Sequence, residues 1–101
     1  MTGQELKTSA EKARALGVYE SRYYFFQPDH NGLAAGCFLT LALVGKVEDY
    51  TLARTMFFNS ELDQFDFFAK ELGITKEQAT AISELHCAGR GSELATFLET
   101  I

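Results

Sequence analysis

The chain has little of what would set it apart from an ordinary globular protein. Its 101 residues include one proline and eight glycines, too few for a low-complexity linker. The two cysteines, Cys37 and Cys87, are fewer than a secreted disulfide framework usually has. We therefore expect both to be free thiols in a reducing compartment.

Segments that insert into membranes are also missing. The most apolar run, residues 33–44, has 12 residues, whereas a membrane-spanning helix needs about 20. Residues 1–16 are polar with mixed charges, unlike a secretory signal peptide. We expect a cytoplasmic protein that has no contact with membranes.

Positive charge is scarce and unevenly distributed. The chain has 9 Lys and Arg against 14 Asp and Glu, a formal net charge of −5. Residues 1–47 carry a net charge of +1, and residues 48–101 carry −6. Nonspecific binding to nucleic acid depends on neutralising phosphates. The charge therefore argues against a direct nucleic-acid partner and assigns an acidic surface to the second half.

What is present is the composition of one folded domain. Hydrophobic residues make up 47% of the chain and charged residues 23%, which is typical of globular proteins rather than disordered ones. A chain of this length can bury one core but not two. We find no internal repeat, and we predict a single globular domain over residues 1–101.

Signals that start and stop helices agree with the apolar periodicity along most of the chain. Thr2 with Glu5, and Thr75 with Gln78, have the spacing of a capping box, which starts a helix. Ser60 is a further predicted start. Glycines that accept left-handed backbone are the predicted stops: Gly17, Gly45, Gly73 and Gly89. We predict an all-α protein, a compact bundle of five or six short helices around a central apolar helix.

Two segments decide how the centre of this bundle is built. Residues 33–44 are apolar on all sides except at Thr40, which is typical of a buried helix. The Thr40 hydroxyl would bond the carbonyl four residues before it. Residues 18–27 are rich in Tyr and Phe, which favours a strand, yet they lack strict alternation. We favour a helix ended by Pro28, and a strand remains the alternative.

Patterns for catalysis and for metal binding are weak. His86 and Cys87 are adjacent, so on a helix they point about 100° apart and make a poor chelate. We place His86 at the rim of a buried helix face and Cys87 at the surface. Cys37 lies in the apolar segment, where burial makes a thiol unreactive. We therefore expect no enzymatic activity, no cofactor and no metal.

The segment before the last predicted helix is a weak candidate for anion binding. Backbone amides near Arg90, Gly91 and Ser92 could hold a phosphate, but the segment matches neither glycine-rich phosphate motif. A helix stop followed by Ser92 as N-cap is the favoured explanation. The last two predicted helices have the outline of a helix-turn-helix, but the outward residues of the second are acidic or neutral. We therefore expect no DNA binding there.

The aromatic residues give the strongest functional signal. Nine Phe and four Tyr make up 13% of the chain. Phe67 lies opposite the apolar stripe of its predicted helix, and one of Phe57 and Phe58 should face outward. Exposed aromatics with an acidic rim are typical of protein interfaces. The predicted partner-binding residues are Phe58, Glu61, Asp63, Asp66, Phe67 and Glu71.

These features lead to three hypotheses about function. The first is a small, acidic, non-enzymatic interaction module, a regulator, adaptor or inhibitor, that docks a partner protein with a basic surface. The second is a homo-oligomer whose aromatics meet across a two-fold axis. The third is a small-ligand-binding domain with a pocket beside residues 33–44, where small side chains such as Ala34 and Gly36 leave space.

Overall fold

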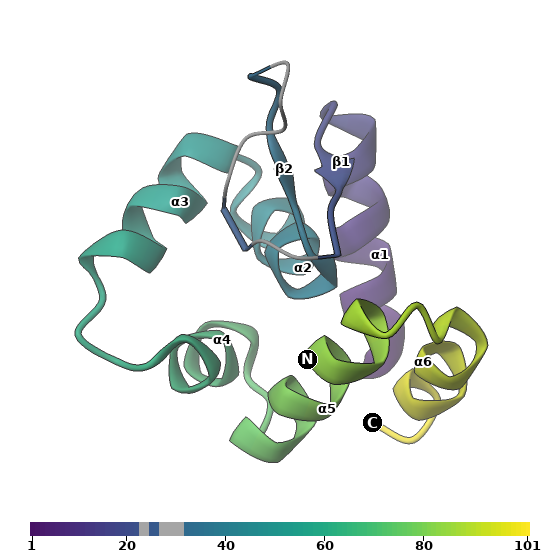
Figure 1. The fold of residues 1–101 in the computed structure, drawn as a ribbon. Coiled ribbons are helices and arrows are strands. Elements are labelled where there is room, and N and C mark those ends of the chain that lie inside the picture. The colour runs from purple at the N-terminus through teal and green to yellow at the C-terminus, as the bar shows by residue number, and fades with distance from the viewer. Residues whose placement is uncertain (23–24, 27–31) are drawn as a thin grey trace.

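Six helices and one pair of short strands form the part of the chain that the structure describes (Figure 1). The structure is a computed structural model, and it describes residues 1–22, 25–26 and 32–101. The elements are α1 (Gly3–Ala15), β1 (Tyr19–Glu20), β2 (Ala35–Gly36), α2 (Phe38–Val47), α3 (Tyr50–Asn59), α4 (Gln64–Leu72), α5 (Lys76–Cys87) and α6 (Gly91–Leu98). The predicted mainly-α bundle is confirmed.

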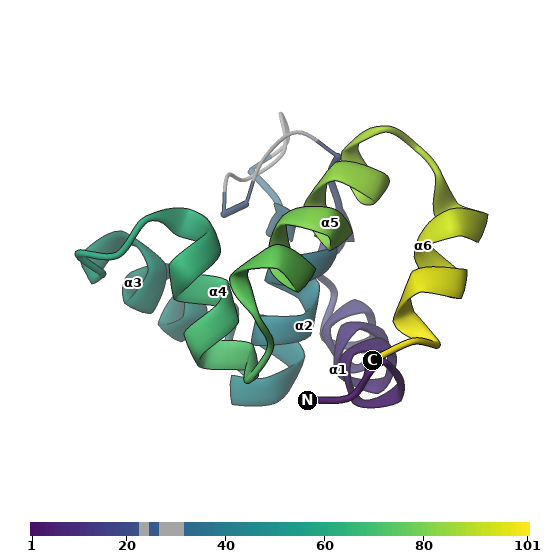
Figure 2. The ribbon, with the colours of Figure 1, turned by 90° about the horizontal axis from the view of Figure 1, so that it is seen from below.

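Helix α2 is the centre of the bundle. Every residue from Phe38 to Gly45 is buried. Figure 2 shows α3 and α4 to one side of α2, α1 and α6 to the other, and α5 beside it. The apolar segment does form the central helix, but the helix begins at Phe38 rather than at Leu33 because Ala35 and Gly36 form β2.

The predicted helix over residues 18–27 is wrong at its start. Tyr19 and Glu20 form β1, which runs parallel to β2 with Tyr19 opposite Ala35 and Glu20 opposite Gly36. The alternative prediction of a strand is therefore correct for these two residues. Their partner strand, Ala35–Gly36, lies in a segment that was predicted to be helical throughout. Residues 23–24 and 27–31, which include Pro28, lie outside the described residues.

Local start and stop signals are confirmed for several helices. Thr2 and Glu5 form a capping box at the start of α1, and Thr75 and Gln78 form another at the start of α5. Gly73 ends α4 in the left-handed conformation, with φ at 63°. These boundaries depend on residues within one turn, so the sequence alone was enough to predict them.

Two predicted N-caps are wrong, by three residues and by two residues. The Asp63 carboxylate accepts a hydrogen bond from the Phe65 amide at 2.9 Å, so α4 begins after Asp63 and not at Ser60. Helix α6 begins after Arg90, without a side-chain cap, and not at Ser92. At both ends a nearby residue takes the N-cap position, and such small shifts are the usual uncertainty in helix boundaries.

Gly45 lies inside α2 and does not end it as predicted. A Cβ atom at Gly45 would lie 1.7 Å from the carbonyl oxygen of Ser9, so glycine is what lets α1 and α2 approach so closely. The helix instead ends at Glu48, which takes the left-handed conformation with φ at 60°. Gly3 allows a similar approach of α6, because a Cβ there would lie 1.7 Å from the Leu98 carbonyl oxygen.

Most of the described aromatic rings pack together in the core. Phe25 and Phe26, which follow β1, contact Phe57 of α3 and Phe68 of α4 with ring centroids 5.1 to 6.2 Å apart. The Thr40 hydroxyl donates to the Phe25 carbonyl, not to the carbonyl four residues back as predicted. Most of the described aromatic residues thus belong to the core. Each ring pair stabilises the fold by about 0.5–1.5 kcal/mol beyond the contribution of apolar burial.

Candidate functional site

Phe67 is buried, and the prediction that it faces solvent or a partner is wrong. Only 3% of its surface is exposed. Its ring packs edge-on against Phe57 of α3 and Phe68 of the same helix, with centroids 5.5 and 5.3 Å away. Helix α4 also contacts α2 and α5. Neighbouring elements therefore bury more of its surface than the single apolar stripe that was predicted. Phe67 therefore belongs to the core.

Phe58, Glu61 and Asp63 of the predicted partner face are exposed around the connection between α3 and α4, together with Leu62, which was not predicted to belong to it. Phe58 is 61% exposed and Leu62 is 46% exposed, while Phe57 turns inward, as the consecutive pair predicted. The Arg54 guanidinium lies 5.0 Å from the centre of the Phe58 ring. Glu61 is exposed beside them. We call Phe58, Glu61 and Leu62 the α3–α4 surface.

The other predicted acidic residues already have partners within the protein. The Lys76 ammonium donates to Asp63 at 2.9 Å and to Asp66 at 3.3 Å. Glu71 is half-buried, and its backbone carbonyl accepts a hydrogen bond from Lys46. Asp63 also caps α4. These contacts account for the carboxylates of Asp63 and Asp66 without a partner protein, but for Glu71 they involve only the backbone.

The three residues predicted for anion binding do not converge on one point. The Arg90 guanidinium lies 3.4 Å from the carboxylate of Glu93, and Ser92 is exposed. Gly91, in contrast, lines a cavity on the inner side of α6. The cavity draws its cationic side chains from elsewhere in the chain.

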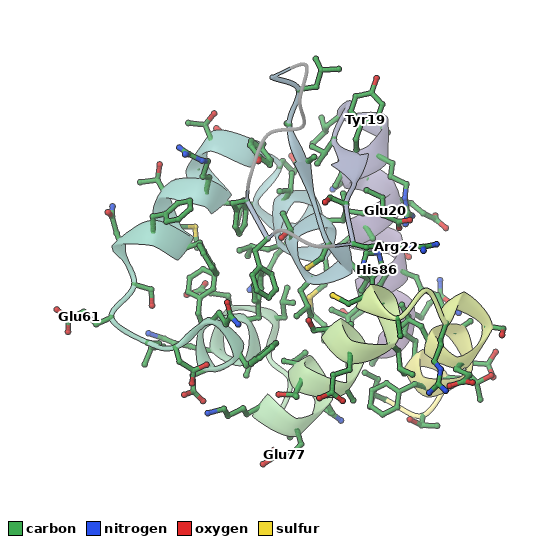
Figure 3. All side chains as sticks on the ribbon, viewed as in Figure 1. Tyr19, Glu20, Arg22, Glu61, Glu77 and His86 are labelled. Atoms are coloured by element: carbon green, nitrogen blue, oxygen red, sulfur yellow. The ribbon has the colours of Figure 1, made fainter. Side chains whose placement is uncertain are left out.

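This cavity has a volume of about 310 Å³ and lies between α1 and α6, beside β1 and the end of α5. Its charged and titratable lining comes from distant parts of the sequence: Lys7, Arg14, Glu20, Arg22 and His86. Its apolar lining is Phe38, Leu94, Ala95 and Leu98. Figure 3 shows Glu20, Arg22 and His86 together where β1 passes the end of α5, with Glu61 far away on the opposite side.

His86 is the residue that marks this cavity as unusual. Its side chain is only 8% exposed, and neither ring nitrogen makes a hydrogen bond to any part of the chain that the structure describes. Nε2 lies 3.5 Å from the Glu20 carboxylate without completing one. A buried polar group left unsatisfied costs about 1–3 kcal/mol, so native proteins rarely leave one without a partner.

The His86 ring is neutral at neutral pH. Burial lowers its pKa below the ordinary value of 6.5, while the nearby Glu20 carboxylate opposes that shift. A neutral imidazole has one nitrogen that donates and one that accepts. His86 lines the cavity, and among the described residues the group nearest to its ring nitrogens is the Glu20 carboxylate, 3.5 Å from Nε2.

The charges around His86 leave an excess of positive charge in an otherwise acidic protein. Arg14 donates to the Glu20 carboxylate at 2.9 Å. Burial by itself raises the pKa of Glu20, but the hydrogen bond from Arg14, the nearby His86 ring and the Arg14 charge lower it overall. Lys7 and Arg22 make no ion pair within the described residues. The lining thus holds three cations and one carboxylate.

Arg22 is held at the cavity by the end of α5. The Cys87 thiol donates to the Arg22 carbonyl, and the Arg22 guanidinium lies against Gly89. A Cβ at Gly89 would come within 3.0 Å of Arg22 Nη1, and the φ of 71° also favours glycine. Cys87 is exposed as predicted, so the helix stop and the exposed thiol together position an arginine.

Sequence reasoning missed most of this site. His86 was placed at the rim of a buried face, which is close to its position, but Lys7 and Arg14 looked like ordinary polar positions on an amphipathic helix. Two signals were available. Lys7 and Arg14 are seven residues apart, so they share one face of α1. Lys7, Arg14 and Arg22 are also three of the five basic residues in residues 1–47.

Reactive and metal-binding groups are not assembled elsewhere in the described ranges. Cys37 is buried, and burial raises the pKa of its thiol to about 11, which makes it unreactive as predicted. Across residues 1–22, 25–26 and 32–101, no three His, Cys, Asp or Glu side chains are grouped so that they could hold a metal ion. His30 lies outside these ranges. Among the described helices, none has the length and apolar character to span a membrane.

No protein-family model matches this chain, and neither does any curated protein or solved structure. The candidate site is therefore defined by its own geometry. It is a cavity with an apolar floor and a cationic wall, and the wall contains a buried histidine without hydrogen-bond partners in the described structure.

Proposed function

We propose that this protein binds a small molecule in the cavity beside His86 and does not transform it. The observation that carries the proposal is that both ring nitrogens of an almost completely buried side chain lack a hydrogen-bond partner among the described residues. A ligand in the cavity would supply the missing donor and acceptor. The energetic penalty of leaving them unpaired would then become part of the binding free energy.

The cavity has the anatomy of a small-molecule pocket. Such pockets have volumes of roughly 300–1,000 Å³, with mostly apolar walls and a few polar groups that orient the ligand. Here Phe38, Leu94 and Leu98 supply the apolar wall, and His86 and Arg22 supply polar groups at one end. Phe38 at the start of α2 lines this cavity, whereas Ala34 and Gly36, where the sequence led us to expect space, do not.

Binding without catalysis fits the groups that line the cavity. The described lining residues include no hydroxyl or thiol side chain that could act as a nucleophile. Glu20 is bound to Arg14 and is not free to act as a general base. We also propose a reducing, cytoplasmic location, which the free thiols of Cys37 and Cys87 support.

Fragment screening by NMR tests this function. Protein labelled with ¹⁵N at histidine has two ring systems, His30 and His86, and the spectrum of a His86→Leu variant assigns them. Fragments that bind in the cavity should shift the ring nitrogens of His86.

A matched pair of variants on α6 provides the control. Ala95→Trp places a large ring in the cavity and should abolish the shifts, whereas Thr96→Trp, on the exposed side of the same helix, should preserve them. If a broad library shifts neither His86 nitrogen, or if Ala95→Trp binds as well as the wild type, the cavity is not a binding site.

A second candidate function is the interaction module predicted from the sequence, now centred on the α3–α4 surface. Exposed Phe58 and Leu62 beside Glu61 support it, and exposed apolar residues with an acidic rim suit a partner with a basic surface. A pull-down at low and high salt should capture a partner that Phe58→Ala and Glu61→Lys both lose. Retention of the partner by both variants would exclude this surface.

The homo-oligomer remains a weaker proposal. The hypothesis was based on the large number of aromatic residues. Most of the described aromatic rings, however, pack against one another within a single copy of the chain. Exposed Tyr19, Leu16 and Leu33 are the apolar residues left on the side of β1. Sedimentation at low concentration tests the hypothesis, because a stable monomer excludes it.

A further inference from the structure

The charges of the cavity are opposite to those of the protein as a whole. The chain carries a formal net charge of −5, yet Lys7, Arg14 and Arg22 gather around one cavity with a single carboxylate. Like charges placed together repel one another. An anion in the cavity would therefore be attracted by these side chains.

The three cations are not equivalent. Arg14 already binds Glu20 at 2.9 Å, so its charge is largely neutralised inside the protein. Lys7 and Arg22 have no ion-pair partner among the described residues. Arg22 presents a planar fork of donors, which suits the two oxygens of a carboxylate or a phosphate. Arg22 and Lys7 thus carry the positive charge of the cavity that has no ion-pair partner among the described residues.

The remaining wall limits what the rest of the ligand can be. Phe38, Leu94 and Leu98 are buried side chains, and they line the same cavity as the cations. A fully polar ion would leave this apolar wall against water, whereas an apolar body would cover it. A cationic ligand would be repelled by Lys7 and Arg22.

We infer that the ligand is a small organic anion whose carboxylate or phosphate group binds Arg22, Lys7 and His86, and whose apolar body packs against Phe38, Leu94 and Leu98. This inference rests on the proposed function, because it names the class of molecule that the cavity takes. His86 contributes its donor nitrogen to the anion, beside the Arg22 guanidinium.

A set of small compounds with one ring and different charges tests the inference. Benzoate, phenyl phosphate, benzamide and benzylamine share the ring and differ in the polar group, and inorganic phosphate provides the anion without the ring. Benzoate or phenyl phosphate should bind about tenfold more tightly than benzamide, which corresponds to one additional charge-assisted contact. Benzylamine and inorganic phosphate should bind at least tenfold more weakly than the better of the two organic anions.

Charge-removing variants identify which cations hold the anion. Arg22→Gln and Lys7→Gln should each weaken binding of the organic anion several-fold and leave benzamide binding unchanged. Lys12→Gln is the matched control, because Lys12 is on α1 and pairs with Glu48 outside the cavity. It should change neither affinity. Equal losses in all three variants would show a general charge effect and overturn the specific site.

The outcomes separate this inference from the function on which it rests. If benzamide or benzylamine shifts the His86 nitrogens as strongly as benzoate does, the cavity binds ligands but the class is wrong. If none of the five probes binds while the broad library yields another ligand, the class is again wrong and the function stands. If nothing in the library binds, both the inferred ligand class and the proposed function are refuted.

Discussion

Replacing His86 by leucine should stabilise the ligand-free protein, which is the reverse of the usual effect of a buried substitution. Leucine has a similar volume and no polar atoms, so it fills the same space without unpaired nitrogens. In the wild type neither ring nitrogen has a hydrogen-bond partner in the described structure. The substitution therefore removes an unsatisfied polar group instead of a favourable contact.

The size of the effect follows from the contacts of His86. An unsatisfied buried polar group costs about 1–3 kcal/mol. The attraction between Nε2 and the Glu20 carboxylate 3.5 Å away offsets part of that cost, and imperfect packing of leucine offsets more. We expect a net gain of about 1 kcal/mol in the free energy of unfolding, or about 4–8 °C in Tm for a domain of this size.

Urea and thermal unfolding of ligand-free protein at pH 7.5 measure this gain, and fragment binding measures its functional consequence. His86→Leu should be more stable and should no longer bind fragments, a trade-off that is common at functional sites. Because the attraction to Glu20 offsets only part of the cost, a double-mutant cycle with Glu20→Gln should give a coupling energy below about 0.5 kcal/mol. A loss of stability in His86→Leu, together with strong coupling to Glu20, would show that the pair is a structural contact and refute the reasoning.

Three further predictions concern stability. Burial lowers the pKa of His86, and the Glu20 charge opposes that shift. Below pH 6.5 the unfolded chain therefore takes up a proton more readily than the folded protein does, so the free energy of unfolding should fall on acidification. Urea unfolding at several pH values should show this fall, and it should be smaller in His86→Leu. Gly45→Ala should destabilise by about 1–3 kcal/mol through its clash with α1, whereas Gly91→Ala, with open space around it, should change urea unfolding by less than about 0.5 kcal/mol. Phe67→Ala should lower the free energy of unfolding by about 3–5 kcal/mol, whereas Phe58→Ala, at an exposed position, should lower it by less than about 1 kcal/mol. Similar decreases in both variants would contradict the burial of Phe67.

Local signals in the sequence were enough to determine much of the helical framework. The capping boxes at Thr2 and Thr75 and the stop at Gly73 act through hydrogen bonds within one turn, so they work wherever the helix lies. The apolar segment had to be buried, because a helix without a polar face has no side to turn toward water. The inert Cys37 follows from the same burial.

Tertiary structure decided the features that depend on two distant segments. Tyr19 and Glu20 became a strand because β2 lay beside them. Gly45 was required by the backbone of α1, not by the end of its own helix. Phe67 was covered because a second helix packs on the side of α4 that periodicity had assigned to solvent.

The candidate site belongs entirely to this second group. Its residues span Lys7 to Leu98, and each one by itself looks like an ordinary polar or apolar position on a helix or turn. Only the packing of α6 against α1 and of β1 against the end of α5 brings the cations, the apolar wall and His86 to one cavity. Periodicity reports which side of a helix is buried, but not which distant side chains will meet there.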